Sequence, residues 1–269
     1  MYTPQLTNTM PEGPECHNAA LKLERVCKGK LITSVEIHGG RYKKHGPFEG
    51  FEKMQVHIRE KGSTVKAVGS RGKLIVMFFD NDWCLLCTLG LKGGWTSKKA
   101  DHCDVSIDVD CKRRIWFKDQ IHYGTLRYVD LAEATNKMKA LGPDVTVRDQ
   151  AFTEDYLDKL MTRYATWDVS KLLMDQSKMS GIGNYLKAEI LYKAKIAPNR
   201  LCETITADEK SELFDAIMTI PSAYWMSYTG GPTIQIQVYN RKKDKLGHAV
   251  EKCKTKDGRT SHWVPAIQR

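Results

Sequence analysis

The sequence predicts an α+β protein with two domains, a strand-rich one followed by a helical one. Between residues 31 and 130, short segments rich in β-branched residues alternate with Gly-containing turns, a spacing that is typical of a sandwich or a barrel. After residue 131 the segments acquire helical periodicity, with little strand character between them. Strands first and helices second indicate separate domains, with a boundary around residues 131–145.

The first element expected is a helix from Pro11 to about Lys28. Pro and Glu residues stand in its first turn, apolar residues repeat inside it, and Gly29 follows as the stop. The residues before it have no helix or strand pattern. We therefore expect residues 1–10 to be a leader that is disordered or removed.

Eight strands are expected after this helix, and five helices after the strands. A Gly-containing turn at residues 69–72, directly before Lys73, predicts a hairpin. The expected strands are residues 31–39, 53–60, 63–69, 73–79, 83–90, 104–110, 114–119 and 125–130. The expected helices are residues 131–142, 153–164, 168–175, 184–196 and 208–220. Strand character returns at residues 234–243 and 260–269, which predicts a basic hairpin at the end of the chain.

The charge balance limits the class of partner. The formal net charge is +10, and residues 236–269 contain nine Lys and Arg against three Asp and Glu, so this tail alone carries +6. A concentrated basic excess favours a polyanion such as DNA. A basic, well-solvated surface would give the same count, so both interpretations stay open on charge alone.

The remaining composition indicates an intracellular, soluble protein. No window approaches the ~18 consecutive apolar residues of a membrane helix, and the first residues lack the apolar region of a signal peptide. The eight cysteines are scattered, as expected of free thiols in a reducing compartment. Cys84 and Cys87 have half of a zinc-site spacing, but on a strand they would face opposite sides, which disfavours a metal site there.

Three separated segments carry candidate chemistry, and each also has an ordinary structural interpretation. Residues 10–15 read MPEGPE, which could simply begin a helix. Residues 69–75 read GSRGKLI, in which Lys73 could be a solvated turn lysine. Residues 172–189 place Gly181 and Gly183 directly before a helix that starts at Asn184. Glycines in that place let helix N–H groups approach a phosphate, but packing is their more common role.

In this order and combination, the three segments resemble the signatures of the formamidopyrimidine-DNA glycosylase/endonuclease VIII family. The resemblance extends over roughly residues 11–269, nearly the whole chain. It implies an N-terminal β-sandwich with an N-terminal helix, then a helical helix–two-turn–helix domain with a C-terminal β-hairpin finger. The implied function is base-excision-repair DNA glycosylase with AP lyase activity, which removes an oxidised base and nicks the strand by β/δ-elimination.

By this resemblance, three residues are catalytic. The family removes its initiator Met and uses the new N-terminal Pro, here Pro11, as nucleophile. A free α-amino group has a pKa of roughly 7.7–8.0, against about 10.4 for lysine, so part of it is neutral at physiological pH. Its attack on the deoxyribose C1′ would displace the base and leave a Schiff base. Glu12 would protonate the ring oxygen as the sugar opens, and Lys73 would reach the phosphate beside the flipped nucleotide.

The resemblance assigns five further residues to DNA binding. Asn184 and Arg259 would contact the backbone near the lesion, Arg259 from the minor groove. Leu91, His122 and Tyr123 would fill the void left by the everted base, since extruding a base costs a few kcal/mol of stacking. His122 stands where the family has arginine, and Leu91 where methionine is usual. Ordinary roles as core or strand residues stay open for these void-filling positions.

The C-terminal finger departs from the family pattern of four zinc-binding cysteines. Val264 and Ile267 stand at one pair of ligand positions, Leu246 and Ala249 replace the other pair, and the single Cys253 cannot hold zinc. We therefore expect a zincless finger held by packing, with no metal and no other cofactor.

A second departure concerns the substrate. Only six residues separate Gly231 from Val238, where relatives that excise 8-oxoguanine have a longer loop. The short connection favours oxidised pyrimidines as substrates, with ring-opened purines left open.

The third departure is the position of the N-terminal motif. Nine residues precede Met10, and in a chain that starts at Met1 the Pro11 nitrogen is a tertiary amide, which is useless as a nucleophile. We expect Met10 to be the working start, or else a protease to expose Pro11. The alternative function is a non-catalytic protein that binds damaged DNA or abasic sites with a blocked N-terminus. An RNA-binding protein is disfavoured by the conjunction of Pro11, Glu12 and Lys73.

Four segments are therefore expected. They are a leader at residues 1–10, a β-sandwich catalytic domain at 11–135, a helix–two-turn–helix DNA-binding domain at 145–235 and the zincless finger at 236–269. The expected partner is damaged duplex DNA, with single-stranded DNA left open. No membrane is expected as a partner, and we expect a monomer in the nucleus or the cytoplasm, depending on the host.

Overall fold

The computed structural model describes residues 10–60 and 62–269, and the chain divides into two compact units. The first, called the sheet unit, contains Met10, Pro11 and residues 15–140. The second, called the helical unit, contains residues 12–14 and 141–269. The separation of strands from helices confirms the predicted α+β class.

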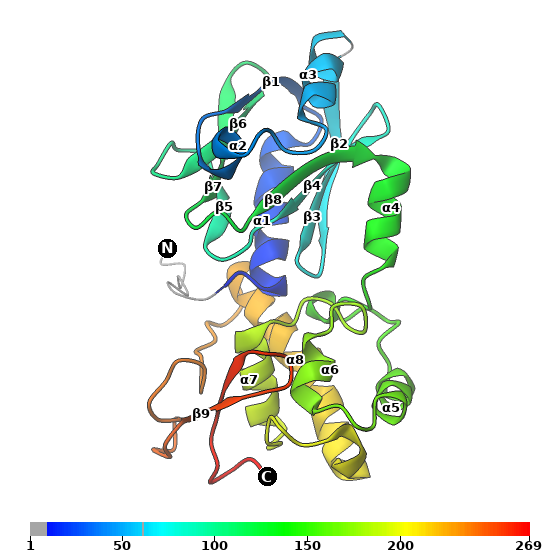
Figure 1. Ribbon diagram of the computed structural model, residues 1–269, viewed down its shortest axis with the longest axis vertical. Helices are drawn as coiled ribbons and strands as arrows, with labels where there is room; N and C mark the ends of the chain where they lie inside the picture. Colours follow the sequence, from blue (N-terminus) through cyan, green and yellow to red (C-terminus); the bar gives the residue numbers. More distant parts are fainter. Residues whose placement is uncertain (1–9, 61) are drawn as a thin grey trace. The chain divides into compact units, whose positions relative to one another are not determined.

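The sheet unit is built on one eight-stranded antiparallel sheet (Figure 1). Its strand order is β5-β7-β6-β1-β2-β3-β4-β8. The two halves of the sheet meet at β1 and β2, which pair only at Leu31↔Thr64 and Ile32↔Ser63. The strands are β1 (Leu31–Ile37), β2 (Ser63–Arg71), β3 (Leu74–Phe79), β4 (Trp83–Thr88), β5 (Gly93–Thr96), β6 (Cys103–Val109), β7 (Arg113–Asp119) and β8 (Thr125–Asp130).

A common core fills the space between the two halves of the sheet. Val105 and Phe117 from one half, and Ile75 and Leu126 from the other, belong to one buried cluster. The helix α1 (Gly13–Cys27) adds Cys16, Ala20, Leu23 and Cys27 to the same cluster, at the three- and four-residue spacing of one helix face. This packing confirms the predicted sandwich and the predicted N-terminal helix.

The outer face of β3, β4 and β8 is covered by the helix α4 (Leu131–Lys139). Here Val76, Cys84, Leu86 and Val129 form a second buried cluster. Cys87 belongs instead to the inner cluster. The two cysteines therefore face opposite sides of their strand, as expected.

One predicted strand is wrong. Residues 53–60 lie in the helix α3 (Phe51–Glu60), not in a strand. The β-branched residues of this segment suggested a strand, but its buried residue Met54 and its core contacts Phe51 and Ile58 recur at helical spacing. The short helix α2 (Gly40–Lys44) and the strand β5 were not expected from the sequence.

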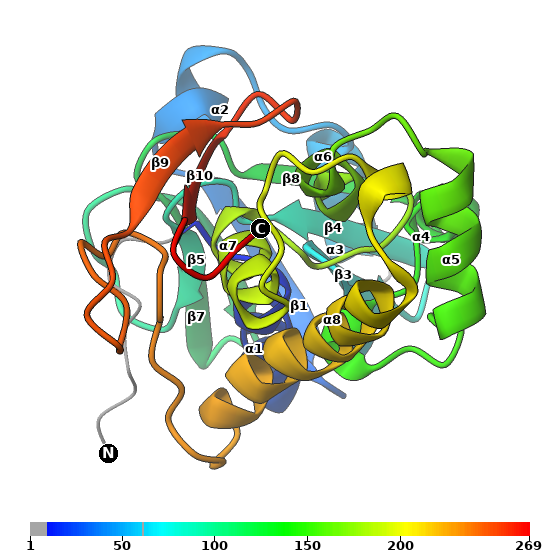
Figure 2. The ribbon, with the colours of Figure 1, turned by 90° about the horizontal axis from the view of Figure 1, so that it is seen from below.

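The helical unit contains four α-helices in its described residues, and all of them begin close to the predicted positions. They are α5 (Glu154–Arg163), α6 (Val169–Met174), α7 (Asn184–Lys193) and α8 (Ala207–Tyr228), with short 3-10 turns at Val145–Val147 and Cys202–Thr204. The last helix is longer than predicted, because it continues through Pro221. Figure 2 shows α7 between α8 and the strand β10. Because α7 is enclosed in this way, all residues from 185 to 191 are buried.

The C-terminal hairpin begins later than expected. Its strands are β9 (Glu251–Lys254) and β10 (Thr260–Trp263), and residues 234–243 form no strand. In that segment the N–H groups of Gln237, Val238 and Tyr239 all bind the Glu189 carboxylate at 2.8–3.0 Å. Main-chain donors that bind a side chain are not available to a sheet partner, which explains the wrong prediction.

The finger rests on α7 through apolar contacts. Val264 is fully buried in a cluster with Ala188 and Val238, and Ile267 packs against that cluster. Leu246, expected at another ligand position, is 65% exposed. Across residues 10–60 and 62–269, no group of three His, Cys, Asp or Glu side chains is placed to hold a metal ion. Within the same residues, no helix is both long and apolar enough to cross a membrane.

We predict that Val264→Ala lowers the free energy of unfolding by about 1–3 kcal/mol, because it leaves a cavity between the finger and α7. Leu246→Ala, at an exposed position, is the matched control and should change it by less than about 0.5 kcal/mol. Urea titration followed by circular dichroism measures both. Excess EDTA should leave the wild-type midpoint unchanged, and a midpoint that falls with EDTA would show that a metal holds the finger.

Candidate functional site

The Glu12 carboxylate accepts main-chain hydrogen bonds at the start of α7. Its side chain is buried, with 1% of the residue exposed. It accepts N–H groups from Gly183 at 2.7 Å, Tyr185 at 2.8 Å and Leu186 at 3.1 Å. All four residues belong to the helical unit. Glu12 thus binds the N-terminus of α7.

The sequence of α7 explains why an acidic residue from far away is needed there. The first N–H groups of a helix have no partner inside the helix, and Gly183 at the N-cap position has no side chain to satisfy them. A carboxylate also complements the positive end of the helix dipole. We expected Glu12 to lie in the first turn of its own helix, but α1 begins one residue later, at Gly13.

Gly183 is required for space at this contact. A Cβ atom on Gly183 would lie 2.3 Å from the Glu12 carboxyl carbon and 2.4 Å from its Oε1. A main-chain hydrogen bond beside this contact helps to hold Glu12 next to Gly183, because Gly13 N–H donates to the Gly181 carbonyl at 2.8 Å. The Gln176 amide completes the turn by donating to the Ile182 carbonyl and accepting from Gly181 N–H. The conformation of residues 181–183, directly before α7, therefore leaves space for the Glu12 carboxylate.

Lys73 lies in the turn between β2 and β3 and is half-buried. Its carbonyl oxygen is 3.6 Å from the Cys16 thiol of α1. Within the sheet unit, this contact places the Lys73 turn against the first turns of α1, five residues after Pro11. Pro11 itself is half-buried and precedes the helix.

The sheet register brings the other candidates of the sheet unit to the same end. Leu74 pairs with Thr88, and Thr88 pairs with Thr125. Three connections therefore leave the sheet at the same end of these strands. They are the residues just before Leu74, those just after Thr88 and those just before Thr125. Lys73, Leu91 and Tyr123 lie in these connections.

The two loops that carry Leu91 and Tyr123 touch each other. A Cβ on Gly90 would lie 2.5 Å from the Tyr123 carbonyl carbon and from the Gly124 nitrogen, so only glycine allows this approach. The Asp119 carboxylate accepts Gly124 N–H at 2.7 Å and fixes the second loop. Tyr123 is 67% exposed, whereas Leu91 is half-buried.

His122 is directed toward an acidic side chain. Its Nδ1 lies 3.1 Å from Oδ2 of Asp104, which is buried. Burial raises the pKa of the Asp104 carboxyl, although the hydrogen bond from His122 lowers it. The backbone of His122 is left-handed, with φ 60°. In this arrangement His122 helps to fix its own loop.

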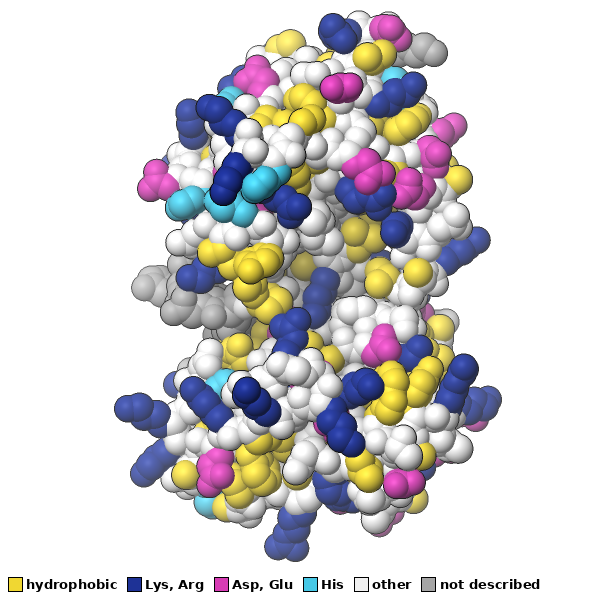
Figure 3. Space-filling model, in the orientation of Figure 1, with side chains coloured by type: hydrophobic (Ala, Val, Ile, Leu, Met, Phe, Trp, Pro, Cys, Tyr) yellow, Lys and Arg dark blue, Asp and Glu magenta, His cyan; other side chains and the backbone are white. Residues whose placement is uncertain are grey.

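Asn184 contacts the finger hairpin next to Arg259, within the helical unit. The Asn184 amide nitrogen donates to the Thr260 carbonyl at 2.9 Å, and Arg259 is exposed on the hairpin turn directly before Thr260. Figure 3 shows one face of the molecule, on which Lys and Arg side chains outnumber Asp and Glu side chains over the helical unit. This face suits a polyanion.

Two charged residues of this region were missed by sequence reasoning. Lys187 lies inside the buried helix α7 and pairs with Asp257 of the hairpin turn at 2.6 Å. A lysine followed by Ile190 and Leu191 on the same helix face is a signal of a buried ion pair, because an unpaired charge would be too costly on a buried face. The Asp257–Gly258 dipeptide is likewise a hairpin-turn signal.

Comparison with known proteins identifies the family. A family model described as the formamidopyrimidine-DNA glycosylase N-terminal domain matches residues 10–126. A second, the formamidopyrimidine-DNA glycosylase H2TH domain, matches residues 141–223. The chain belongs to the formamidopyrimidine-DNA glycosylase/endonuclease VIII family.

Relatives within this family align over nearly their whole lengths. A formamidopyrimidine-DNA glycosylase of Desulforamulus reducens is 28% identical over 97% of this chain and 99% of its own. An endonuclease 8 of Pectobacterium carotovorum is 25% identical over 97% of this chain and 100% of its own.

Solved structures confirm the fold of the family. A Lactococcus lactis formamidopyrimidine-DNA glycosylase, non-covalently bound to DNA containing an AP site, has a TM-score of 0.81 at 22% identity, covering 96% of this chain and 99% of that one. The wild-type L. lactis protein in complex with DNA containing an oxidised pyrimidine has a TM-score of 0.82 at 23% identity, covering 96% of this chain and 100% of that one.

We predict that Gly183→Ala displaces the Glu12 carboxylate from the start of α7. Loss of these charged hydrogen bonds should lower the free energy of unfolding by about 2 kcal/mol. Gly94→Ala is the control, because a Cβ there meets nothing within 4 Å. Urea unfolding of both variants checks this, and equal midpoints for Gly183→Ala and wild type would contradict the steric argument.

Proposed function

We propose that this protein is a base-excision-repair DNA glycosylase with AP lyase activity that uses Pro11 as its nucleophile. The observation that carries the proposal is the match of the family's N-terminal domain model from Met10 onward, which puts Pro11 second in the matched region. In a chain that starts at Met10, removal of that methionine would expose the Pro11 amine. The next residue, Glu12, is buried and fixed on α7, as a positioned acid should be.

The proposed reaction starts with attack of the Pro11 nitrogen on C1′ of the damaged nucleotide. A bond forms between this nitrogen and C1′, the glycosidic bond breaks, and the base leaves with the proton that the amine gives up. Glu12 would then give a proton to the ring oxygen as the sugar opens, which leaves an iminium at C1′. The resulting iminium withdraws electrons and permits elimination of the 3′ phosphate and then of the 5′ phosphate.

The remaining candidate residues are proposed to hold the DNA. Lys73, Asn184 and Arg259 would contact phosphates, while Leu91 and Tyr123, with His122 behind them, would occupy the space of the everted base. The exposed ring of Tyr123 supports such a role. We propose residues 11–135 as the catalytic domain, residues 145–235 as the DNA-binding domain and residues 236–269 as the finger.

We propose oxidised pyrimidines in duplex DNA as the favoured substrates. The six-residue connection between Gly231 and Val238 supports this choice, since it leaves little chain for a lid over a purine. The presence of endonuclease 8 proteins among the relatives agrees with it. The protein would act as a monomer inside the cell, in the nucleus or the cytoplasm according to its host.

Borohydride trapping tests the nucleophile. Chains that begin at Met1 and at Met10 are incubated with duplex DNA carrying an oxidised pyrimidine, and borohydride reduces any Schiff base to a stable adduct. We predict an adduct only from the chain whose Pro11 amine is free, and mass spectrometry should place it on Pro11. An adduct from a chain with a proven N-terminal extension would contradict the assignment. Intact damage binding without an adduct from either chain would favour a non-catalytic damage-binding protein.

Glu12→Gln separates base removal from strand cleavage. We predict that this variant loses at least about a hundredfold in base excision, the scale of general acid catalysis. It should retain most of its cleavage of a preformed abasic site, from which no base must leave. Glu24→Gln, on the surface of α1, is the control and should keep both activities. Equal loss of both activities in Glu12→Gln would mean that Glu12 acts only through folding.

A further inference from the structure

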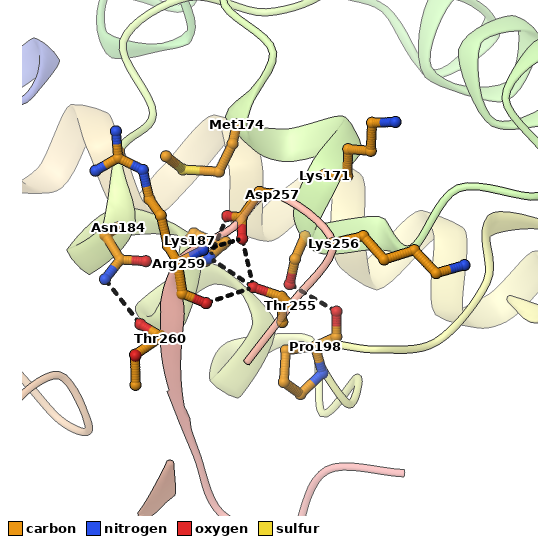
Figure 4. Close-up of polar contacts among 12 residues, drawn as sticks. Lys171, Met174, Asn184, Lys187, Pro198, Thr255, Lys256, Asp257, Arg259 and Thr260 are labelled. Carbon is orange, nitrogen blue, oxygen red and sulfur yellow. Dashed lines mark hydrogen bonds and ion pairs between the residues drawn. The ribbon is translucent and has the colours of Figure 1, made fainter. Parts of the chain in front are cut away.

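The hairpin turn of the finger is held by a buried ion pair. Lys187 of α7 has no exposed side-chain surface, and its Nζ lies 2.6 Å from Asp257 Oδ2 and 3.4 Å from the Thr255 hydroxyl. Figure 4 shows Lys187 and Asp257 pointing toward each other, while the Arg259 side chain extends away from the pair. The pair joins α7 to the turn at residues 255–259.

The same Asp257 carboxylate also holds the main chain of Arg259. Asp257 Oδ1 accepts Arg259 N–H at 3.0 Å, while its Oδ2 binds Lys187. Thr255 N–H donates to the Arg259 carbonyl at 3.1 Å, and the Thr255 hydroxyl lies 3.1 Å from that oxygen. The N–H and the carbonyl of Arg259 are therefore both bound within the clamped turn, the N–H to Asp257 and the carbonyl to Thr255.

A second carboxylate ties the turn to α6. Asp168 caps that helix by accepting Lys171 N–H at 2.7 Å through Oδ1. Its Oδ2 accepts Lys256 N–H at 2.8 Å. Asp168 is 1% exposed, so both bonds are shielded from water. The turn is thus fixed to two helices without any metal ligand.

We propose that Lys187, Asp257 and Asp168 form a metal-free clamp that positions Arg259 for its DNA phosphate. The inference rests on the proposed function, because it takes Arg259 as a phosphate contact. In this chain the clamp does for the turn what coordination does in a zinc finger. Lys187, Asp257 and Asp168 are positioning residues and need not touch DNA.

The energetics of buried ion pairs support a positioning role. Burial lowers the pKa of Lys187, and the Asp257 carboxylate opposes that shift. Burial would raise the pKa of Asp257, but the hydrogen bonds from Lys187 and Thr255 bring it below its usual value. A buried pair can often be replaced by apolar residues without loss of stability, whereas removal of one partner is costly. Stability alone therefore does not explain why this pair is present.

A double-mutant cycle on DNA binding tests the clamp. Arg259→Ala is introduced into wild type, into Asp257→Asn and into the charge-neutral double variant Lys187→Met/Asp257→Leu. Each protein is titrated with a fluorescent duplex carrying a tetrahydrofuran abasic-site analogue between roughly 50 and 200 mM salt. Circular dichroism verifies that each variant is folded, and the double variant keeps the test valid if Asp257→Asn does not fold.

In wild type, we expect Arg259→Ala to weaken binding about tenfold and to lower the salt slope by about one. In both clamp-deficient backgrounds the same substitution should weaken binding less than about twofold, because Arg259 is already out of position. Asp155→Asn, which breaks the exposed Asp155–Lys159 pair, is the control background and should preserve the full effect of Arg259→Ala.

A full tenfold effect of Arg259→Ala in the folded double variant would overturn the clamp and leave the proposed function standing. If Arg259→Ala has no effect in wild type, Arg259 does not contact a DNA phosphate, and the proposed role of the clamp is wrong as well. Absence of any preference for the abasic duplex in wild type would instead contradict the proposed function.

Discussion

The contact between Glu12 and the start of α7 is the constraint on which the helical unit depends. One carboxylate from the beginning of the chain satisfies three N–H groups of a helix that begins at residue 184. That helix is buried along most of its length. Farther along it, Lys187 holds the hairpin turn and Glu189 holds residues 237–239. The proposed catalytic acid and the proposed DNA contacts of this unit therefore share one rigid element.

Side-chain carboxylates bind main-chain N–H groups at several places in the helical unit. Glu12 and Glu189 each bind three consecutive or nearly consecutive N–H groups, and Asp168 and Asp257 each bind main-chain donors of the finger. Such carboxylates satisfy backbone donors that would otherwise be buried without partners. The hairpin turn of the finger is thereby held by Asp168 at the start of α6 and by Lys187 of α7. Val264 adds apolar contacts between the finger and α7.

Much of this could be predicted from the sequence, and the errors have physical causes. Helical periodicity located α1, and the runs rich in β-branched residues between Gly-containing turns located all but one of the predicted strands of the sheet. The same patterns misassigned α3, whose β-branched residues mask a helical repeat, and residues 234–243, whose N–H groups bind Glu189 instead of a neighbouring strand. Pro11, Glu12 and Lys73 could be named from short motifs. The Lys187–Asp257 pair joins residues 70 positions apart, and local patterns carry no signal of its partner.

The measurement that tests the central contact most directly is amide hydrogen exchange at Gly183, Tyr185 and Leu186, compared between wild type and Glu12→Ala. We expect these three amides to exchange slowly in wild type and at least about tenfold faster in the variant. The amides of residues 188–193, bonded within α7, should keep their protection. Unchanged exchange at all three would show that Glu12 does not hold this helix, and would contradict the structural basis of its role as the positioned acid.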